Sequence, residues 1–305
     1  MGESGPIDAL VDELLRGEGS TLRGAATSSQ RREEVLWEEA LEGLRQRLRD
    51  RGALPPRRSP LPHAPADAFG LDRHALESVR PVFDWLYRRW FRVTSCGHEN
   101  IPPEGPVVFV ANHGGVLPFD AAMLIVDGLR HRERVMRALV DRFVARLPRL
   151  QTAFAALGQV IGTRENFRGL LQAGEWVLVF PEGVAGIRKS FLSRFHLEPF
   201  HPGFVEEAIR AGAPVVPVAL VGPESQAPVL ADLPAIADRL GLPSFPVTPT
   251  FPWLGPLGLV PLPVRYRIRY AAPLSAEALA VDEPRVLAQE LREGLQALIG
   301  ELRRE

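Results

Sequence analysis

Residues 107–120 read VVFVANHGGVLPFD, a buried-strand pattern followed directly by a polar cluster. The first five residues are apolar and mostly β-branched, which is typical of a strand covered on both faces. Two similar runs follow, WVLVF at 176–180 and VVPVALV at 215–221, and helical patterns lie between the three. Strands that alternate with helices predict an α/β fold, in which helices flank a layered and largely parallel sheet.

Periodicity and turn residues predict the remaining elements. Helices are expected at 71–93, 120–129, 142–157 with an interruption at Pro148, 165–172, 203–211 and 282–304. Extended segments are expected at 159–161 and 264–270, whereas 134–140 fits either a strand or a helix.

The chain divides into an N-terminal helical extension and one larger domain. Residues 1–66 combine two helical patterns with a stretch, 51–66, whose five prolines predict an extended linker. The domain is expected at 67–305, with its core at about 93–273. A chain of 305 residues with 46% hydrophobic content is long enough to bury such a core.

Composition narrows the possible functions. The net charge of −1 provides no overall attraction to nucleic acid, so no nucleic-acid partner is expected. The single cysteine, Cys96, excludes an internal disulfide, and the N-terminus lacks the pattern of a secretory signal. Residues 240–264 form the longest uncharged run, but their seven prolines rule out a continuous membrane-spanning helix.

His113 and Asp120 are the candidate acid–base pair. In a parallel sheet, ligands gather beyond the carboxyl ends of the strands, which is where His113 is predicted to lie. Asp120 can accept a hydrogen bond from one imidazole nitrogen, leaving the other to remove a hydroxyl proton. Gly114 permits close substrate approach, and backbone donors near it can hold an oxyanion. The alternative is a loop histidine and an aspartate that caps a helix.

Two further clusters can bind a substrate. Glu182 and Gly183 belong to FPEG at 180–183, where a carboxylate fixed at a strand end can hold a polar headgroup; the alternative is a plain turn. Arg164 directly precedes a predicted helix, a position that suits a phosphate. Its alternative is a surface arginine that pairs locally.

In this order and at these strand ends, the three clusters resemble the sequence blocks of the glycerolipid acyltransferase superfamily. The resemblance covers about residues 93–273 and implies that His113 is the catalytic base and Asp120 its supporting carboxylate. It assigns substrate binding to Asn112, Gly114, Arg164, Glu182, Gly183 and Lys189. In the commonest form of the family's first block, four residues separate His and Asp. Here six residues separate them, which is closer to the monoacylglycerol and diacylglycerol acyltransferase-like branch.

The resemblance implies direct transfer of a fatty acyl group to a hydroxyl of a lysophospholipid or acylglycerol. The acyl donor is then a substrate, acyl-CoA or acyl carrier protein, and no cofactor is expected. Expected partners are the lipid acceptor, the thioester donor and a membrane surface, with the protein cytoplasmic and peripheral on the inner face of the membrane. Two alternatives are a thioesterase or lipid hydrolase with the same base, and a non-catalytic lipid-binding protein on the same fold.

Two segments suggest contact with lipid. The helix at 71–93 carries five large aromatics beside arginines, which fits a headgroup layer or an ordinary packed helix. The apolar stretch 251–259 fits a lip that enters a bilayer or roofs an acyl channel, or a strap buried on the core. His196 and His201 lack the spacing of a zinc motif, so no metal is expected.

Overall fold

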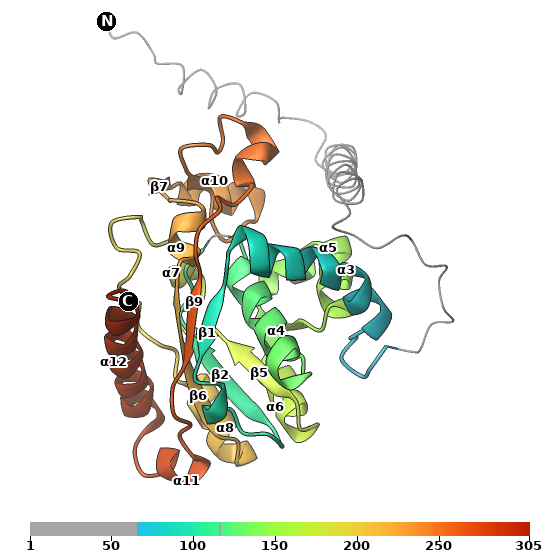
Figure 1. The fold of residues 1–305 in the computed structure, drawn as a ribbon, viewed down its shortest axis with the longest axis vertical. Coiled ribbons are helices and arrows are strands. Elements are labelled where there is room, and N and C mark those ends of the chain that lie inside the picture. Colours follow the sequence, from blue (N-terminus) through green and yellow to red (C-terminus); the bar gives the residue numbers. More distant parts are fainter. Residues whose placement is uncertain (1–65, 116) are drawn as a thin grey trace, which may run out of the picture. The chain divides into compact units, whose positions relative to one another are not determined.

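A seven-stranded sheet forms the centre of the computed structural model, which describes residues 66–115 and 117–305 (Figure 1). Its strands lie in the order β1-β9-β6-β2-β5-β3-β4, and all neighbours are parallel except β6 and β9. The strands are β1 Thr94–Cys96, β2 Val107–Ala111, β3 Met136–Val140, β4 Val160–Ile161, β5 Trp176–Val179, β6 Val215–Val221 and β9 Arg267–Tyr270. The predicted largely parallel sheet is confirmed. The extension predicted at 1–66 lies, apart from Ala66, outside the described residues.

Helices cover both faces of this sheet (Figure 1). Strand β2 shows why both are covered: Val108 and Val110 pack into the core on one face, while Phe109 packs into the core on the other. Helices α6 (Arg164–Gln172), α8 (Gly203–Ala211) and α12 (Pro284–Leu302) contribute to the first core. Helix α4, Phe119–Arg132, contributes to the second.

Further helices and turns complete the described chain. They are α3 Arg73–Trp85, η1 Leu86–Trp90, η2 His98–Asn100, η3 Arg142–Arg146, α5 Pro148–Ala156, α7 Val184–Ile187, α9 Pro223–Gln226, α10 Pro234–Leu240, η4 Gly255–Leu259 and α11 Ala276–Leu279. Strands β7 (Ala231–Asp232) and β8 (Pro246–Val247) form a second, antiparallel pair.

Most predicted elements are found, with differences at proline and at strand ends. Residues 136–140 are a strand, and Pro148 begins α5 because its fixed φ suits a first helical turn. The helix expected at 71–93 starts at Arg73 and ends in the π-helical turn η1, after which the short strand β1 was not predicted. None of the helices in the described part has the length and apolar character needed to cross a bilayer.

The aromatic helix packs on the domain. Tyr87 and Phe91 are buried against Met123 and Val126 of α4 and against Tyr266, which precedes β9. Packing accounts for Tyr87 and Phe91, whereas Arg88, Arg89 and Arg92 remain exposed.

Asp127 joins α4 to the sheet and is wholly buried. The hydroxyls of Tyr87 and Ser95 donate to its Oδ1, each at 2.6 Å, and the hydroxyl of Tyr270 donates to its Oδ2 at 2.7 Å. His98 Nε2 lies 3.0 Å from the same Oδ2. Burial and the charge of Asp127 raise the pKa of both tyrosines. One carboxylate therefore holds three segments of the chain together.

We expect Asp127→Asn to destabilise the protein by about 3 kcal/mol, because an amide nitrogen cannot accept from these hydroxyls. Urea unfolding at neutral pH measures the change. Asp282→Asn, at an exposed position, is the matched control and should leave stability unchanged. Equal stabilities of the two variants would show that the network does not hold the fold.

Candidate active site

Three neighbouring parallel strands, β5, β2 and β6, end at one edge of the sheet. Strand β2 leads into Asn112-His113, β5 into Pro181-Glu182, and β6 into Gly222-Pro223-Glu224. Chemically active side chains from three separate stretches of sequence therefore meet at this edge.

His113 and Asp120 form a close pair. His113 Nδ1 lies 2.5 Å from Asp120 Oδ2, although six residues separate them in sequence. The amide of Gly114 also donates to Oδ2, at 3.2 Å, and that of Ala121 donates to Oδ1 at 2.8 Å. Asp120 is wholly buried in the first turn of α4, where the helix dipole favours its negative charge. A carboxylate can only accept, so Nδ1 carries the hydrogen.

The imidazole is partly exposed and held on one face. Its ring stacks on Phe180, with centroids 4.4 Å apart, and its side chain retains 18% exposure. Among the described residues, none makes a hydrogen bond to Nε2 of His113. This nitrogen is therefore the one available to a substrate.

Asn112 fastens the end of β2 to β6. Its amide donates to the carbonyl of Leu220 at 3.0 Å, and its carbonyl accepts from the N–H of Leu220 at 2.8 Å. The side chain is 2% exposed. Its contacts are those of a residue that positions His113, whereas the sequence predicted a substrate contact.

Both carboxylate oxygens of Glu182 accept hydrogen bonds from other residues of the protein. Its Oε1 accepts from the N–H of His113 at 2.9 Å, and its Oε2 accepts from Lys189 Nζ and from the N–H of Glu198, both at 2.8 Å. Its side chain is fully buried and that of Lys189 nearly so. The carboxylate predicted to hold a headgroup thus contacts the backbone of His113 and Lys189, and its contact with a substrate stays a prediction.

The turn after Glu182 brings α7 against the base. Gly183 adopts a positive φ of 57°, and Gly186 follows in α7. A Cβ on Gly186 would lie 2.9 Å from Glu182 Cβ and 3.0 Å from His113 Cβ. The glycine at 186 therefore allows this helix to pack directly on the pair.

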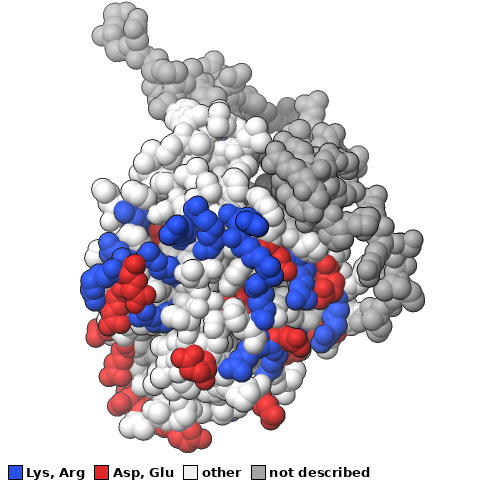
Figure 2. Space-filling view, in the orientation of Figure 1, with Lys and Arg blue, Asp and Glu red and all other residues white. Residues whose placement is uncertain are grey.

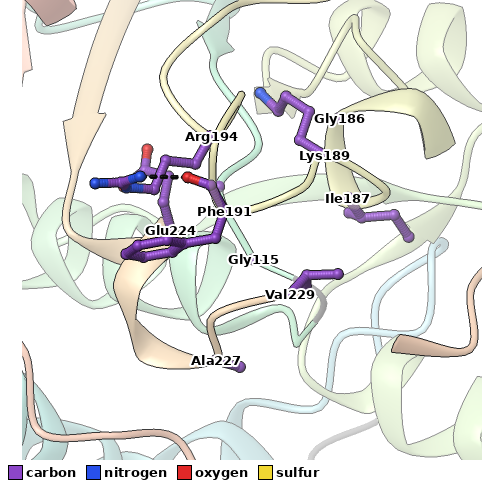
Figure 3. A pocket seen from close by; sticks show the side chains of 10 residues that line it. Gly115, Gly186, Ile187, Lys189, Phe191, Arg194, Glu224, Ala227 and Val229 are labelled. Atoms are coloured by element: carbon purple, nitrogen blue, oxygen red, sulfur yellow. Dashed lines mark hydrogen bonds between the residues drawn. The ribbon is translucent and has the colours of Figure 1, made fainter. Parts of the chain in front are cut away.

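A small pocket adjoins the pair, because Gly114, whose N–H bonds to Asp120, forms part of its wall (Figure 3). Its wall comes from the loop after β2, from α7 with the segment behind it, and from the segment after β6. The lining residues are Gly114, Gly115, Gly186, Ile187, Lys189, Phe191, Arg194, Glu224, Ala227 and Val229. Lys189 therefore lines the pocket and also donates a hydrogen bond to Glu182.

Sequence reasoning missed Arg194 and Glu224. Arg194 donates to the carbonyl of Phe191, stacks over its ring as Figure 3 shows, and has no partner for its buried Nε among the described residues. No local pattern marks it. Glu224 follows a Gly-Pro pair after a buried strand, much as Glu182 follows proline, and that likeness was a usable signal.

Glu224 is buried beside the pair, and its pKa is raised above the ordinary value of a glutamate. Burial raises its pKa to about 7; the N–H of Gly222, 2.9 Å from Oε2, and the charge of Lys189 oppose the rise, and Asp120 adds to it. The carboxyl group is therefore poised between its charged and neutral forms near neutral pH.

Arg164 is not part of this cluster. Its side chain is 58% exposed at the start of α6 and pairs with Glu206 of α8 at 2.7 Å. It does not line the pocket. The structure favours the alternative of local pairing over the predicted phosphate contact.

One group of the described residues offers side-chain ligands for a metal ion, and it does not include His196 or His201. Ligand atoms of His98, Asp127 and His131 lie within 4.8 Å of one another. Both oxygens of Asp127 already accept from hydroxyl groups, as described above. That arrangement is a complete hydrogen-bond network by itself, and the expected absence of a metal stays a prediction.

His113 and the buried Asp120 lie at the carboxyl edge of the sheet, where ligands gather in folds of this kind, and comparison with known proteins gives the class of the domain. The Acyltransferase family model matches residues 92–221, so this is an acyltransferase domain. An uncharacterized protein of Mycobacterium tuberculosis is 40% identical over 242 residues, covering 75% of this chain and 67% of that protein. The chain belongs to the glycerolipid acyltransferase superfamily.

Two more distant proteins extend the comparison. The DGAT1/2-independent enzyme synthesizing storage lipids of Bos taurus is 27% identical over 144 residues, covering 47% of this chain and 43% of that enzyme. The crystal structure of PlsC, the 1-acyl-sn-glycerophosphate (LPA) acyltransferase from Thermotoga maritima, has a TM-score of 0.51 at 18% identity. That match covers 76% of this chain and 80% of PlsC, and it shows a shared fold.

We expect Glu224→Gln to remove a pH dependence of stability. The pKa of Glu224 is about 7 in the folded protein against 4.5 ordinarily, so the folded state holds this proton more tightly. The wild type should therefore lose stability relative to the variant as pH rises from about 4.5 to about 7, by on the order of 3 kcal/mol at most.

Urea unfolding across this pH range measures the difference. Glu290→Gln, at an exposed position of α12, is the control and should track the wild type at every pH. If the curves for Glu224→Gln and wild type run parallel, Glu224 does not titrate as described.

Proposed function

We propose that the protein transfers a fatty acyl group from a thioester to a free hydroxyl of a glycerolipid, with His113 as general base. The supporting observation is the 2.5 Å contact between His113 Nδ1 and the buried Asp120, at the edge of a pocket. It fixes the tautomer in which Nε2 can accept a proton.

The reaction runs in two proton transfers around one acyl transfer. Nε2 of His113 takes the proton of the acceptor hydroxyl as its oxygen attacks the thioester carbonyl. The tetrahedral intermediate then collapses, the carbon–sulfur bond breaks, and the departing thiolate receives the proton back from His113. The buried charge of Asp120 stabilises the imidazolium between these steps. No cofactor enters the balance, because the thioester itself is the activated substrate.

The oxyanion needs a donor other than the amide of Gly114, since that N–H is engaged by Asp120. The next backbone donor along the chain belongs to Gly115, which lines the pocket and has no hydrogen-bond partner for its N–H among the described residues. Lys189 provides positive charge on the same wall. We assign oxyanion stabilisation to this part of the pocket.

The acceptor is a lysophospholipid or an acylglycerol, and the donor is acyl-CoA or acyl carrier protein. The name of the bovine relative refers to storage lipids, and PlsC acts on LPA, so both acceptor types occur among similar proteins. Six residues between His113 and Asp120 agree with the neutral-glycerolipid branch, whereas Lys189 and Arg194 on the pocket wall suit an anionic headgroup. We place the protein on the cytoplasmic face of the inner membrane as a peripheral enzyme.

A transfer assay tests this proposal. Purified full-length protein is given radiolabelled acyl-CoA, or acyl carrier protein, with lysophosphatidate, lysophosphatidylcholine, monoacylglycerol or diacylglycerol. We expect label in one acylated product, and a fall in kcat of about 10²- to 10⁴-fold for His113→Ala. His196→Ala, which changes an exposed histidine, should retain full activity.

Other outcomes support the alternatives. Label found as free fatty acid in a His113-dependent reaction indicates a thioesterase or lipid hydrolase. A protein that binds the lipids yet releases no labelled product with either donor is a non-catalytic binding protein. Equal rates for His113→Ala and wild type would exclude His113 as the base.

A further inference from the structure

A segment beyond the active-site pocket exposes an unusual amount of apolar surface. We call residues 227–263, which lie between α9 and β9, the cap. Its exposed large hydrophobic side chains are Leu230, Leu233, Leu240, Trp253, Leu254, Leu257, Val260 and Leu262. In the rest of the described chain only Leu192, Leu274, Val281 and Val286 are comparable. So high a density of exposed apolar side chains marks an interaction surface.

The cap is also poor in charge. From Leu240 to Pro263 it has no charged residue at all. Three charged residues precede this stretch in the cap: Asp232 turns inward and accepts from the hydroxyl of Ser244 at 2.8 Å, whereas Asp238 and Arg239 of α10 are exposed. On the face that Figure 2 shows, the part of the molecule where Figure 1 places α10 and β7 forms a broad uncharged area.

Arginine residues border the cap. Trp90 Nε1 donates to the carbonyl of Pro261 at 3.0 Å, and Arg92 donates to that of Pro263 at 3.2 Å. The aromatic helix therefore ends against the cap, and its arginines Arg88, Arg89 and Arg92 are exposed there. Figure 2 shows a band of basic side chains directly beneath the uncharged area. We call these three arginines the rim.

This combination is that of a surface that lies in a lipid interface. Apolar side chains gain by leaving water for the acyl region, while basic side chains beside them meet the phosphates of anionic lipids. Trp253 is 61% exposed on the cap, and tryptophan is favoured at the boundary between headgroups and acyl chains. A protein partner would also cover apolar residues, but it gives no particular reason for a basic border.

The cap joins the active-site pocket. Ala227 and Val229, at its start, line the pocket. Phe191 lines it from the opposite segment, where its N–H donates to the carbonyl of Val229 at 2.8 Å, and the next residue, Leu192, is 90% exposed. Apolar surface therefore continues from the cap to the wall of the pocket.

We propose that the cap is the membrane-docking surface of this protein, that it inserts into the interface of an anionic phospholipid bilayer, and that the rim arginines bind the lipid phosphates. Docking in this way presents the pocket to lipid substrates, a consequence that rests on the proposed function. The docking itself does not depend on catalysis.

Vesicle binding tests the proposal. Full-length protein is sedimented with vesicles of phosphatidylcholine alone or mixed with phosphatidylglycerol, at low and high salt. We expect binding to the mixed vesicles, weakened by salt, and at least about tenfold weaker for the double variant Leu254→Ser and Leu257→Ser. The double variant Val281→Ser and Val286→Ser changes exposed apolar residues outside the cap and should bind as the wild type does.

Two further variants separate the parts of the surface. Arg88→Gln with Arg89→Gln should reduce the preference for phosphatidylglycerol and the sensitivity to salt. In vesicles with brominated acyl chains, tryptophan fluorescence should be quenched in the wild type and much less in Trp253→Phe. Thermal unfolding of each variant confirms that it is folded.

The outcomes distinguish this proposal from that for catalysis. If the wild type fails to bind mixed vesicles, or if the cap variant binds as tightly as the wild type, the proposal is wrong even when acyl transfer in detergent is normal. If the cap variant instead turns an oligomer into a monomer and vesicle binding is unaffected, the cap is a contact between copies. His113→Ala should bind vesicles normally, so loss of catalysis alone leaves the docking surface standing.

Discussion

Hydrogen bonds that fix the end of strand β2 set the geometry of the whole site. Asn112 bonds to β6 through Leu220, and the N–H of His113 bonds to Glu182 beyond β5. Leu220 lies in the neighbouring strand β6 and Glu182 follows the neighbouring strand β5, so the register of the sheet positions the imidazole. The loop at 114–119 then only has to return Asp120 to the imidazole ring of His113. This explains how six intervening residues still give a 2.5 Å contact.

Burying several carboxyl groups beside one another is costly unless each has partners. Asp120 has two amide donors and His113, and Glu182 has two amide donors and Lys189. Glu224 has fewer, and its pKa rises to about 7. The site therefore gives three hydrogen-bond donors to each of the two carboxyl groups that contact His113, and burial leaves the third carboxyl group poised at neutral pH. Two turns further along α4, Asp127 shows the same rule in a structural role.

The fold separates two requirements of an enzyme that works on lipids. Proton transfer needs a fixed, partly dry geometry, which the sheet edge provides. Access to lipid needs apolar surface facing outward, which in our proposal the cap provides from short elements and proline-rich loops. The aromatic helix joins the two parts, because Phe91 packs beneath α4 while Trp90 reaches the carbonyl of Pro261.

The sequence by itself determined the sheet, since apolar runs such as 107–111, 176–179 and 215–221 have no stable place except between two layers. It also indicated His113 and Asp120, because polar residues at strand ends converge in a parallel sheet. It could not show that Arg164 pairs with Glu206 or that Arg194 lines the pocket, because both depend on contacts with residues far away in the sequence. Nor could it show that Glu182 accepts hydrogen bonds from His113, Lys189 and Glu198, or that the apolar residues of the cap face outward. Those outcomes depend on which side chains meet across segments far apart in the chain, and only tertiary packing decides that.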